Sequence, residues 1–149
     1  MKTAVDIMTS NIITVTTETS VQELAKILSD NNISGVPVVD NAGNLLGVVT
    51  ENDLIDQSKK LHIPTVITIL DSVFYLENPN RMEKEMKKMA GATVLDIYSS
   101  EPVSVNEDTT LDDIATIMAE KNIHTLPVVR NTKLIGVIGK KDIIKTLML

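Results

Sequence analysis

The chain has 149 residues, 43% of them apolar, and no cysteine, so disulfides and thiolate metal sites are excluded. Its net charge of −6 works against nucleic-acid binding, because nucleic-acid binders usually present a basic face. The first ten residues lack the long apolar segment of a secretory signal, and no uninterrupted apolar run approaches the roughly 20 residues of a membrane span. We therefore expect a soluble cytoplasmic protein with no role at a membrane.

Residues 1–56 predict the element order β–α–β–β–α. The β-branched run IITV predicts a short first strand. Ser20 followed by Glu23 is a capping-box pattern, and the apolar residues behind it recur at helical spacing. The runs GVPVVD and LLGVVT are joined by the turn-prone NAGN, which predicts a β-hairpin. A second helix is expected from Asn52.

Residues 57–93 are too long for a plain connection in a compact domain, so we expect them to carry structure. A turn is predicted around Pro79, followed by a helix that ends at Gly91. The apolar run IPTVITILDSVFYL is expected to pack on the rest of the chain or on a second copy of it. If it were exposed, it would indicate a partner surface.

Residues 94–149 repeat the first unit. Asp6–Asn41 aligns with Asp96–Asn131 ninety positions later, and after one deletion LLGVVTENDLI aligns with LIGVIGKKDII. A unit of about 50 residues buries too little surface to be secure alone. We therefore expect an α/β (α+β) fold in which two β–α–β–β–α motifs pack with pseudo-twofold symmetry, leaving two equivalent clefts between them.

The paired segments GVPVVDNAGNLLGVVTENDL and TLPVVRNTKLIGVIGKKDI resemble the cystathionine-β-synthase (CBS) domain, here as a tandem pair. The resemblance covers Ala4–Asp56 and Val94–Leu147. It implies a stand-alone regulatory module that binds AMP, ADP, ATP or sometimes S-adenosylmethionine between its motifs. It also implies a disc-like homodimer that acts on a protein target in trans, and no catalysis.

The resemblance implies a first ligand site, in which an aspartate of one motif holds ribose and the other motif sandwiches adenine. Asp53 would bind ribose, with Thr50 and Asn52 toward phosphate. His124 would lie near phosphate, and a histidine there can change its charge near neutral pH; it could equally be an ordinary surface or interface residue. The adenine contacts implied are Pro102, Val103, Ile123 and Pro127.

The second site implied by the resemblance departs from the pattern. Gly139 replaces the threonine, and Ser34 stands where the first site has His124. Lys140 and Lys141 could bind phosphate, although solvated lysines are the more frequent case. We expect this site to be weak, empty or selective for another phosphate count. Its remaining residues are Ile12, Ile13, Ile33, Pro37 and Asp142.

Thr50 and Asp53 have a second interpretation, because a threonine followed three residues later by an aspartate is also a capping box. The recurrence of the aspartate as Asp142, without the hydroxyl, favours a ligand role beside the cap. A ligand-independent dimerising scaffold is the alternative function. An enzyme is not expected, because the sequence shows no nucleophile elbow, phosphate-binding glycine loop or metal-ligand cluster.

Overall fold

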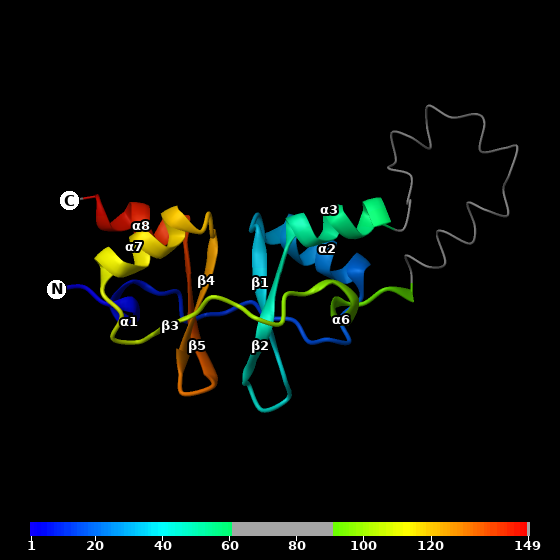
Figure 1. The fold of residues 1–149 in the computed structure, drawn as a ribbon, viewed down its shortest axis with the longest axis horizontal. Helices are drawn as coiled ribbons and strands as arrows, with labels where there is room; N and C mark the ends of the chain where they lie inside the picture. Colours follow the sequence, from blue (N-terminus) through cyan, green and yellow to red (C-terminus); the bar gives the residue numbers. More distant parts are fainter. Residues whose placement is uncertain (61–90, 149) are drawn as a thin grey trace, which may run out of the picture.

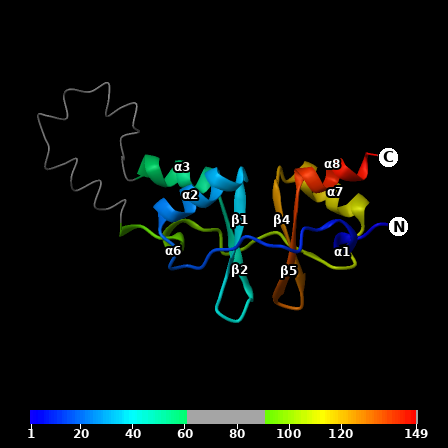
Figure 2. The same cartoon turned by 180° about the vertical axis from the view of Figure 1, so that it is seen from behind.

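The computed structural model describes residues 1–60 and 91–148. Two β-hairpins stand side by side in the middle of the molecule, and helices cover the outer side of each (Figures 1 and 2). The first motif contains α2 (Val21–Asn31), β1 (Gly35–Val39), β2 (Leu45–Thr50) and α3 (Glu51–Lys60). The second contains β3 (Val105–Asn106), α7 (Leu111–Glu120), β4 (Thr125–Arg130), β5 (Lys133–Gly139) and α8 (Lys140–Thr146). The mixed α/β fold with two related motifs is confirmed.

The two hairpins have the predicted pairing and a common irregularity. β1 pairs with β2 and β4 pairs with β5, both antiparallel. The pairing register shifts between Val38 and Val39 in the first hairpin and between Val128 and Val129 in the second. Hence the same bulge occurs at equivalent places in the repeat, as expected for one unit used twice. The last helix of each motif starts one residue earlier than predicted, directly at the end of the hairpin.

The first strand of each motif is shorter than predicted. In the run IITV only Val15 forms a bridge, parallel to Val38, and in PVSVN only Val105–Asn106 pairs with β4. Val15 and Val105 are the buried residues of these runs, whereas Ile13 is 38% exposed. The strands are short because only their last residues reach the hairpin, while the preceding residues run along the boundary between the motifs.

The long helices start and end as their sequences indicate. The Ser20 hydroxyl accepts the Glu23 N–H at 3.0 Å at the start of α2, and Thr110 does the same for α7. Asn32 ends α2 with φ of 52°, and Asn122 has the same φ just after α7. Asparagine tolerates this left-handed conformation, which turns the chain into the following strand.

Two short helices were not predicted, and each packs in the core of the other motif. Helix α1 (Ala4–Ile7) places Ala4 in the core formed by α7, β4 and β5. Helix α6 (Val94–Ile97) places Val94 in the core formed by α2, β1 and β2. Their first backbone N–H groups donate across the motifs, from Ala4 to Thr109 and from Val94 to Thr19, both at 2.8 Å. The two cores are therefore completed by exchange of their first helices.

The exchange explains a glycine in each hairpin. The segment after α6 crosses β2, where Val48 and Ser99 exchange two backbone hydrogen bonds, and a Cβ on Gly47 would lie 2.1 Å from the Ser99 carbonyl oxygen. The segment after α1 crosses β5 in the same way, and a Cβ on Gly136 would lie 2.2 Å from Met8 Sδ. Only glycine leaves room for these close approaches.

The helix expected before Gly91 lies outside the described residues, as does the apolar run of the connecting segment. Within 1–60 and 91–148, no helix combines the length and the apolar character needed to cross a lipid bilayer.

Candidate functional site

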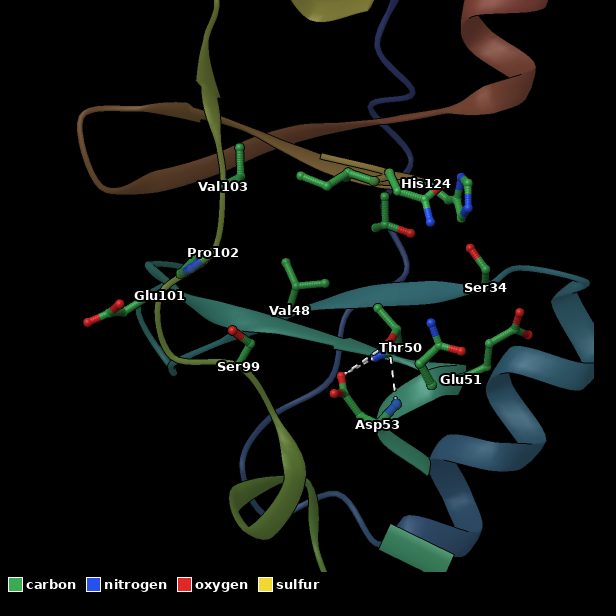
Figure 3. Close-up of a pocket in the computed structure, with 14 residues that line it drawn as sticks. Ser34, Val48, Thr50, Glu51, Asp53, Ser99, Glu101, Pro102, Val103 and His124 are labelled. Atoms are coloured by element: carbon green, nitrogen blue, oxygen red, sulfur yellow. Dashed lines mark hydrogen bonds between the residues drawn. The ribbon is translucent and has the colours of Figure 1, made fainter. Parts of the chain in front are cut away.

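A cavity of about 300 Å³ lies between the two motifs. It is bounded by the turn from β2 into α3, by the segment that follows α6 and by the link between α7 and β4 (Figure 3). Both motifs therefore contribute to one concave surface, as pseudo-twofold packing predicts. Its lining residues are Ser34, Val48, Thr50, Glu51, Asn52, Asp53, Ser99, Glu101, Pro102, Val103, Asn122, Ile123, His124 and Thr125.

The predicted residues of the first site meet in this cavity, with one exception. Thr50, Asn52 and Asp53 come from the first motif, and they face a wall formed by the second. The contribution of the second motif comprises Pro102, Val103, Ile123 and His124. Pro127 is not among the lining residues: it is under 2% exposed, inside β4 opposite Val137. Its predicted contact with adenine stays a prediction.

Several lining residues were not among those predicted for this site. Ser34 was assigned to the second site, but the structure places it in the same cavity as His124. The reason is the symmetry of the repeat, since Gly35 and its counterpart Thr125 lie against each other near the centre of the molecule. The other residues not predicted lie within three positions of predicted ones: Val48, Glu51, Ser99, Glu101, Asn122 and Thr125.

Thr50 and Asp53 form the capping box that starts α3. The Asp53 Oδ2 atom accepts the Thr50 N–H at 2.8 Å and the Thr50 hydroxyl at 3.2 Å (Figure 3). The Asp53 N–H donates to the same hydroxyl at 3.4 Å. The capping interpretation of this pair is therefore confirmed, and these hydrogen bonds fix the Asp53 carboxylate at the N-terminus of α3.

The recurrence of the aspartate does not discriminate between a cap and a ligand role. Asp142 accepts the Gly139 N–H at 2.8 Å, so half of the box survives without a hydroxyl. Asp6 and Asp96 accept the backbone N–H at the starts of α1 and α6 at 2.9 and 2.8 Å. Four helices use the same cap, so the recurrence of the aspartate favours neither role, and a ligand role must rest on the surroundings of each carboxylate.

The predicted residues of the second site have a different setting. The Asp142 Oδ1 atom accepts a hydrogen bond from the Thr9 hydroxyl at 3.1 Å, in addition to the backbone bond at Oδ2. Lys140 and Lys141 are exposed. Pro37 is under 2% exposed within β1, as Pro127 is within β4. Of the isoleucines, Ile12 and Ile33 are half-buried and Ile13 is exposed.

The charges around the cavity are mainly negative. Glu51, Asp53 and Glu101 line it, and no lysine or arginine does so in the described part of the chain. His124 is half-buried, and its Nδ1 atom is buried without a hydrogen-bond partner. Across residues 1–60 and 91–148, no group of three or more potential metal ligands is assembled.

The sequence model of the CBS domain matches residues 4–60 and 94–149. Chloroplastic CBSX2 of Arabidopsis thaliana is 29% identical over 147 aligned residues, which cover 94% of this chain and 61% of that protein. A CBS domain-containing protein of Dictyostelium discoideum is 30% identical over 143 residues, covering 95% and 88%. The chain thus spans less than two thirds of CBSX2 but most of the Dictyostelium protein.

Solved structures have the same architecture. The crystal structure of CBSX2 in complex with AMP matches with a TM-score of 0.74 at 28% identity, covering 99% of this chain and 97% of that chain. The CBS domain pair of protein MJ0100, solved with 5′-methylthioadenosine and S-adenosyl-L-methionine, matches with a TM-score of 0.71 at 24% identity and shares the fold. With both halves matched by the family model and the paired arrangement observed, the chain belongs to the CBS domain family as a tandem pair.

Proposed function

We propose that the chain is a regulatory module that binds an adenosine compound in the cavity between its motifs. The observation that carries the proposal is the state of the Asp53 carboxylate. Within the described residues, the hydrogen bonds from Thr50 both end on Oδ2. The second oxygen, Oδ1, can therefore accept a ribose hydroxyl while the cap stays intact, so one residue serves both roles.

The walls of the cavity suit the other parts of such a ligand. Pro102, Val103 and Ile123 supply an apolar surface from the second motif, and Val48 supplies one from the first. These residues would sandwich adenine. Thr50, Asn52 and His124 would meet the 5′ substituent of the ribose. Because CBSX2, at 28% identity, was crystallised with AMP, the adenosine class is the best-supported ligand.

The second cleft would bind the same class of ligand less well. Thr9 already donates to the second oxygen of Asp142, at 3.1 Å, so a ribose hydroxyl would have to share that oxygen with Thr9. The counterpart of Thr9 is Ser99, and the described structure contains no such bond from Ser99 to Asp53. The same aspartate is thus engaged in one motif and available in the other.

Signalling would follow from a ligand that touches both motifs. Such a ligand favours whichever relative arrangement of the motifs it binds better, and couplings of this kind are typically about 1–3 kcal/mol. A homodimer, a protein target in trans and a cytoplasmic location belong to the same proposal. The alternatives are S-adenosylmethionine in place of a nucleotide, and a dimerising scaffold that needs no ligand.

Calorimetric titration tests the proposal. The purified protein, stripped of any copurified ligand, is titrated with adenosine, AMP, ADP, ATP and S-adenosylmethionine. The Asp96→Ala variant is the matched control, because Asp96 forms the same type of cap at 2.8 Å but does not line the cavity. Saturable binding that is lost in Asp53→Ala and kept in Asp96→Ala is expected. If none of these compounds binds, the scaffold alternative replaces the proposal.

A further inference from the structure

We infer that the cavity prefers adenosyl compounds without phosphate, either uncharged or carrying a positively charged group, over nucleotides, and that Glu51 sets this preference. The inference rests on the proposed adenosine site and narrows its ligand. It follows from the charges that line the cavity and from the way the start of α3 is already satisfied by its own side chains.

The cavity offers a phosphate group repulsion rather than attraction. Three of its lining residues are carboxylates, namely Glu51, Asp53 and Glu101, and in the described structure its lining includes no lysine or arginine. Lys121 is next in sequence to the lining residue Asn122 but is exposed outside the cavity. Glu51 and Glu101 are exposed and Asp53 is half-buried, so solvent screens part of the repulsion. With no cation in the described lining to offset it, each added phosphate should still weaken binding.

The start of α3 would ordinarily attract anions, but here its own side chains supply them. Asp53 accepts the Thr50 N–H at 2.8 Å, and Glu51 is the first residue of the helix. Both carboxylates complement the positive end of the helix dipole. An incoming phosphate would therefore compete with built-in negative charges instead of filling a vacant anion site.

His124 is the remaining ionisable residue in the described lining of the cavity. In the view of Figure 3 it lies toward the same end of the cavity as Ser34 and Glu51. Its Nδ1 atom is buried without a hydrogen-bond partner. A ligand group at this end would therefore lie beside the Glu51 carboxylate as well as the His124 ring.

The second motif carries positively charged residues at the start of its last helix, where the first motif has Glu51. The positions of Glu51 and Asn52 are occupied there by Lys140 and Lys141, and the counterpart of Glu101 is Asn11. The comparison supplies the test variant Glu51→Lys, which copies the second motif into the first. Glu18→Lys is its control, because Glu18 is exposed, lies outside the cavity and gives the same change in net charge.

The experiment is calorimetric titration of adenosine, S-adenosylmethionine, AMP and ATP into wild type, Glu51→Lys and Glu18→Lys. Binding is assigned to the cavity where Asp53→Ala abolishes it. In wild type, adenosine and S-adenosylmethionine, whose sulfonium is positive, should bind more tightly than AMP, and AMP more tightly than ATP. Glu51→Lys should lower the ratio of the AMP to the adenosine dissociation constant about tenfold or more, and Glu18→Lys should leave it unchanged.

Two results would overturn the inference while leaving the proposed site standing. One is tighter wild-type binding of AMP or ATP than of adenosine. The other is an unchanged ratio in Glu51→Lys. Absence of binding by all four compounds would instead remove the proposed function, and the inference with it, so the two failures are distinguishable.

Discussion

The two copies of the repeat place the same aspartate at the same helix start, yet they leave it in different states. Asp53 borders a cavity with hydrogen bonds from Thr50 to one oxygen, whereas Asp142 is held at both oxygens, by Gly139 and Thr9. The cap is therefore a property of the repeat, whereas the bonding of the second carboxylate oxygen differs between the copies. The difference arises from the residues around each carboxylate and not from the cap.

The largest effect is expected from substitution of Gly47 and Gly136, the glycines at which the segments after α6 and α1 cross β2 and β5. Gly47→Ala would place a Cβ 2.1 Å from a backbone oxygen, which cannot move aside, whereas Gly136→Ala would meet the flexible side chain of Met8. We expect about 3 kcal/mol of destabilisation for the first and about 1 kcal/mol for the second, within the usual range for overpacking. Urea unfolding of both variants measures the difference. Equal losses would mean that the two crossings are equally adaptable.

The next prediction separates the helix-capping role of Asp53 from its proposed role in binding a ligand. Asp53→Ala, Asp142→Ala and Asp96→Ala each remove a cap bond and should each cost about 1 kcal/mol in thermal unfolding. Only Asp53→Ala should also weaken adenosyl binding, by at least about tenfold, because a charge-assisted hydrogen bond to ribose is lost. Calorimetry on the three variants tests this. An equal loss of affinity in Asp142→Ala would contradict the ranking of the two clefts.

A smaller effect is expected from releasing the second aspartate. Thr9→Val keeps the shape of the side chain but removes the hydroxyl that donates to Asp142 at 3.1 Å. The freed oxygen should raise affinity at the second cleft a few-fold, since a neutral hydrogen bond is typically worth about 1 kcal/mol. The binding that remains in an Asp53→Ala background measures it. No gain in that background would show that Thr9 is not what restrains this cleft.

The smallest effect concerns pH and salt. In the second motif the Arg130 guanidinium lowers the pKa of Glu107 below its ordinary value of 4.5, chiefly through hydrogen bonds, the shortest of which is 2.7 Å. In the first motif Asn44 lowers the pKa of Asp40, the counterpart of Arg130, through side-chain and backbone hydrogen bonds.

Both carboxylates stabilise the fold when ionised. Because their pKa values are lowered on folding, this contribution is complete above the ordinary values of 4.5 for Glu107 and 3.8 for Asp40 and disappears as the pH falls through the folded values. Glu107→Gln should therefore reduce the loss of melting temperature on acidification, and added salt should mimic it. A salt effect that persists unchanged in the variant would assign it to other charges.

The elements that could be predicted were those with local signals. The hairpins were predicted from β-branched runs around turn residues, and α2 and α7 from hydroxyl caps with apolar spacing. The T-x-x-D pattern that starts α3 also starts α1 and α6 and could have revealed them. Four-residue helices carry too few apolar positions to show a period, so spacing alone did not find them.

The parts of the site that the sequence did not reveal depend on contacts between distant parts of the chain. Pro127 was predicted to contact adenine and Pro37 to belong to the second site, whereas the packing of the two hairpins buries both. Ser34 was assigned to the second site but lines the described cavity, because its neighbour Gly35 lies against Thr125, a contact that no sequence pattern displays. The charge of the cavity was missed for a simpler reason, since Glu51 and Glu101 flank the predicted residues without belonging to a motif.

The exchanged first helices impose an order on synthesis. As the chain leaves the ribosome, the first motif has its own strands and long helices, but its core lacks Val94 until that residue is made, on the order of seconds later. Until then the core of the first motif lacks one of its fully buried residues. The first motif can therefore complete its core only after synthesis of the second motif has begun.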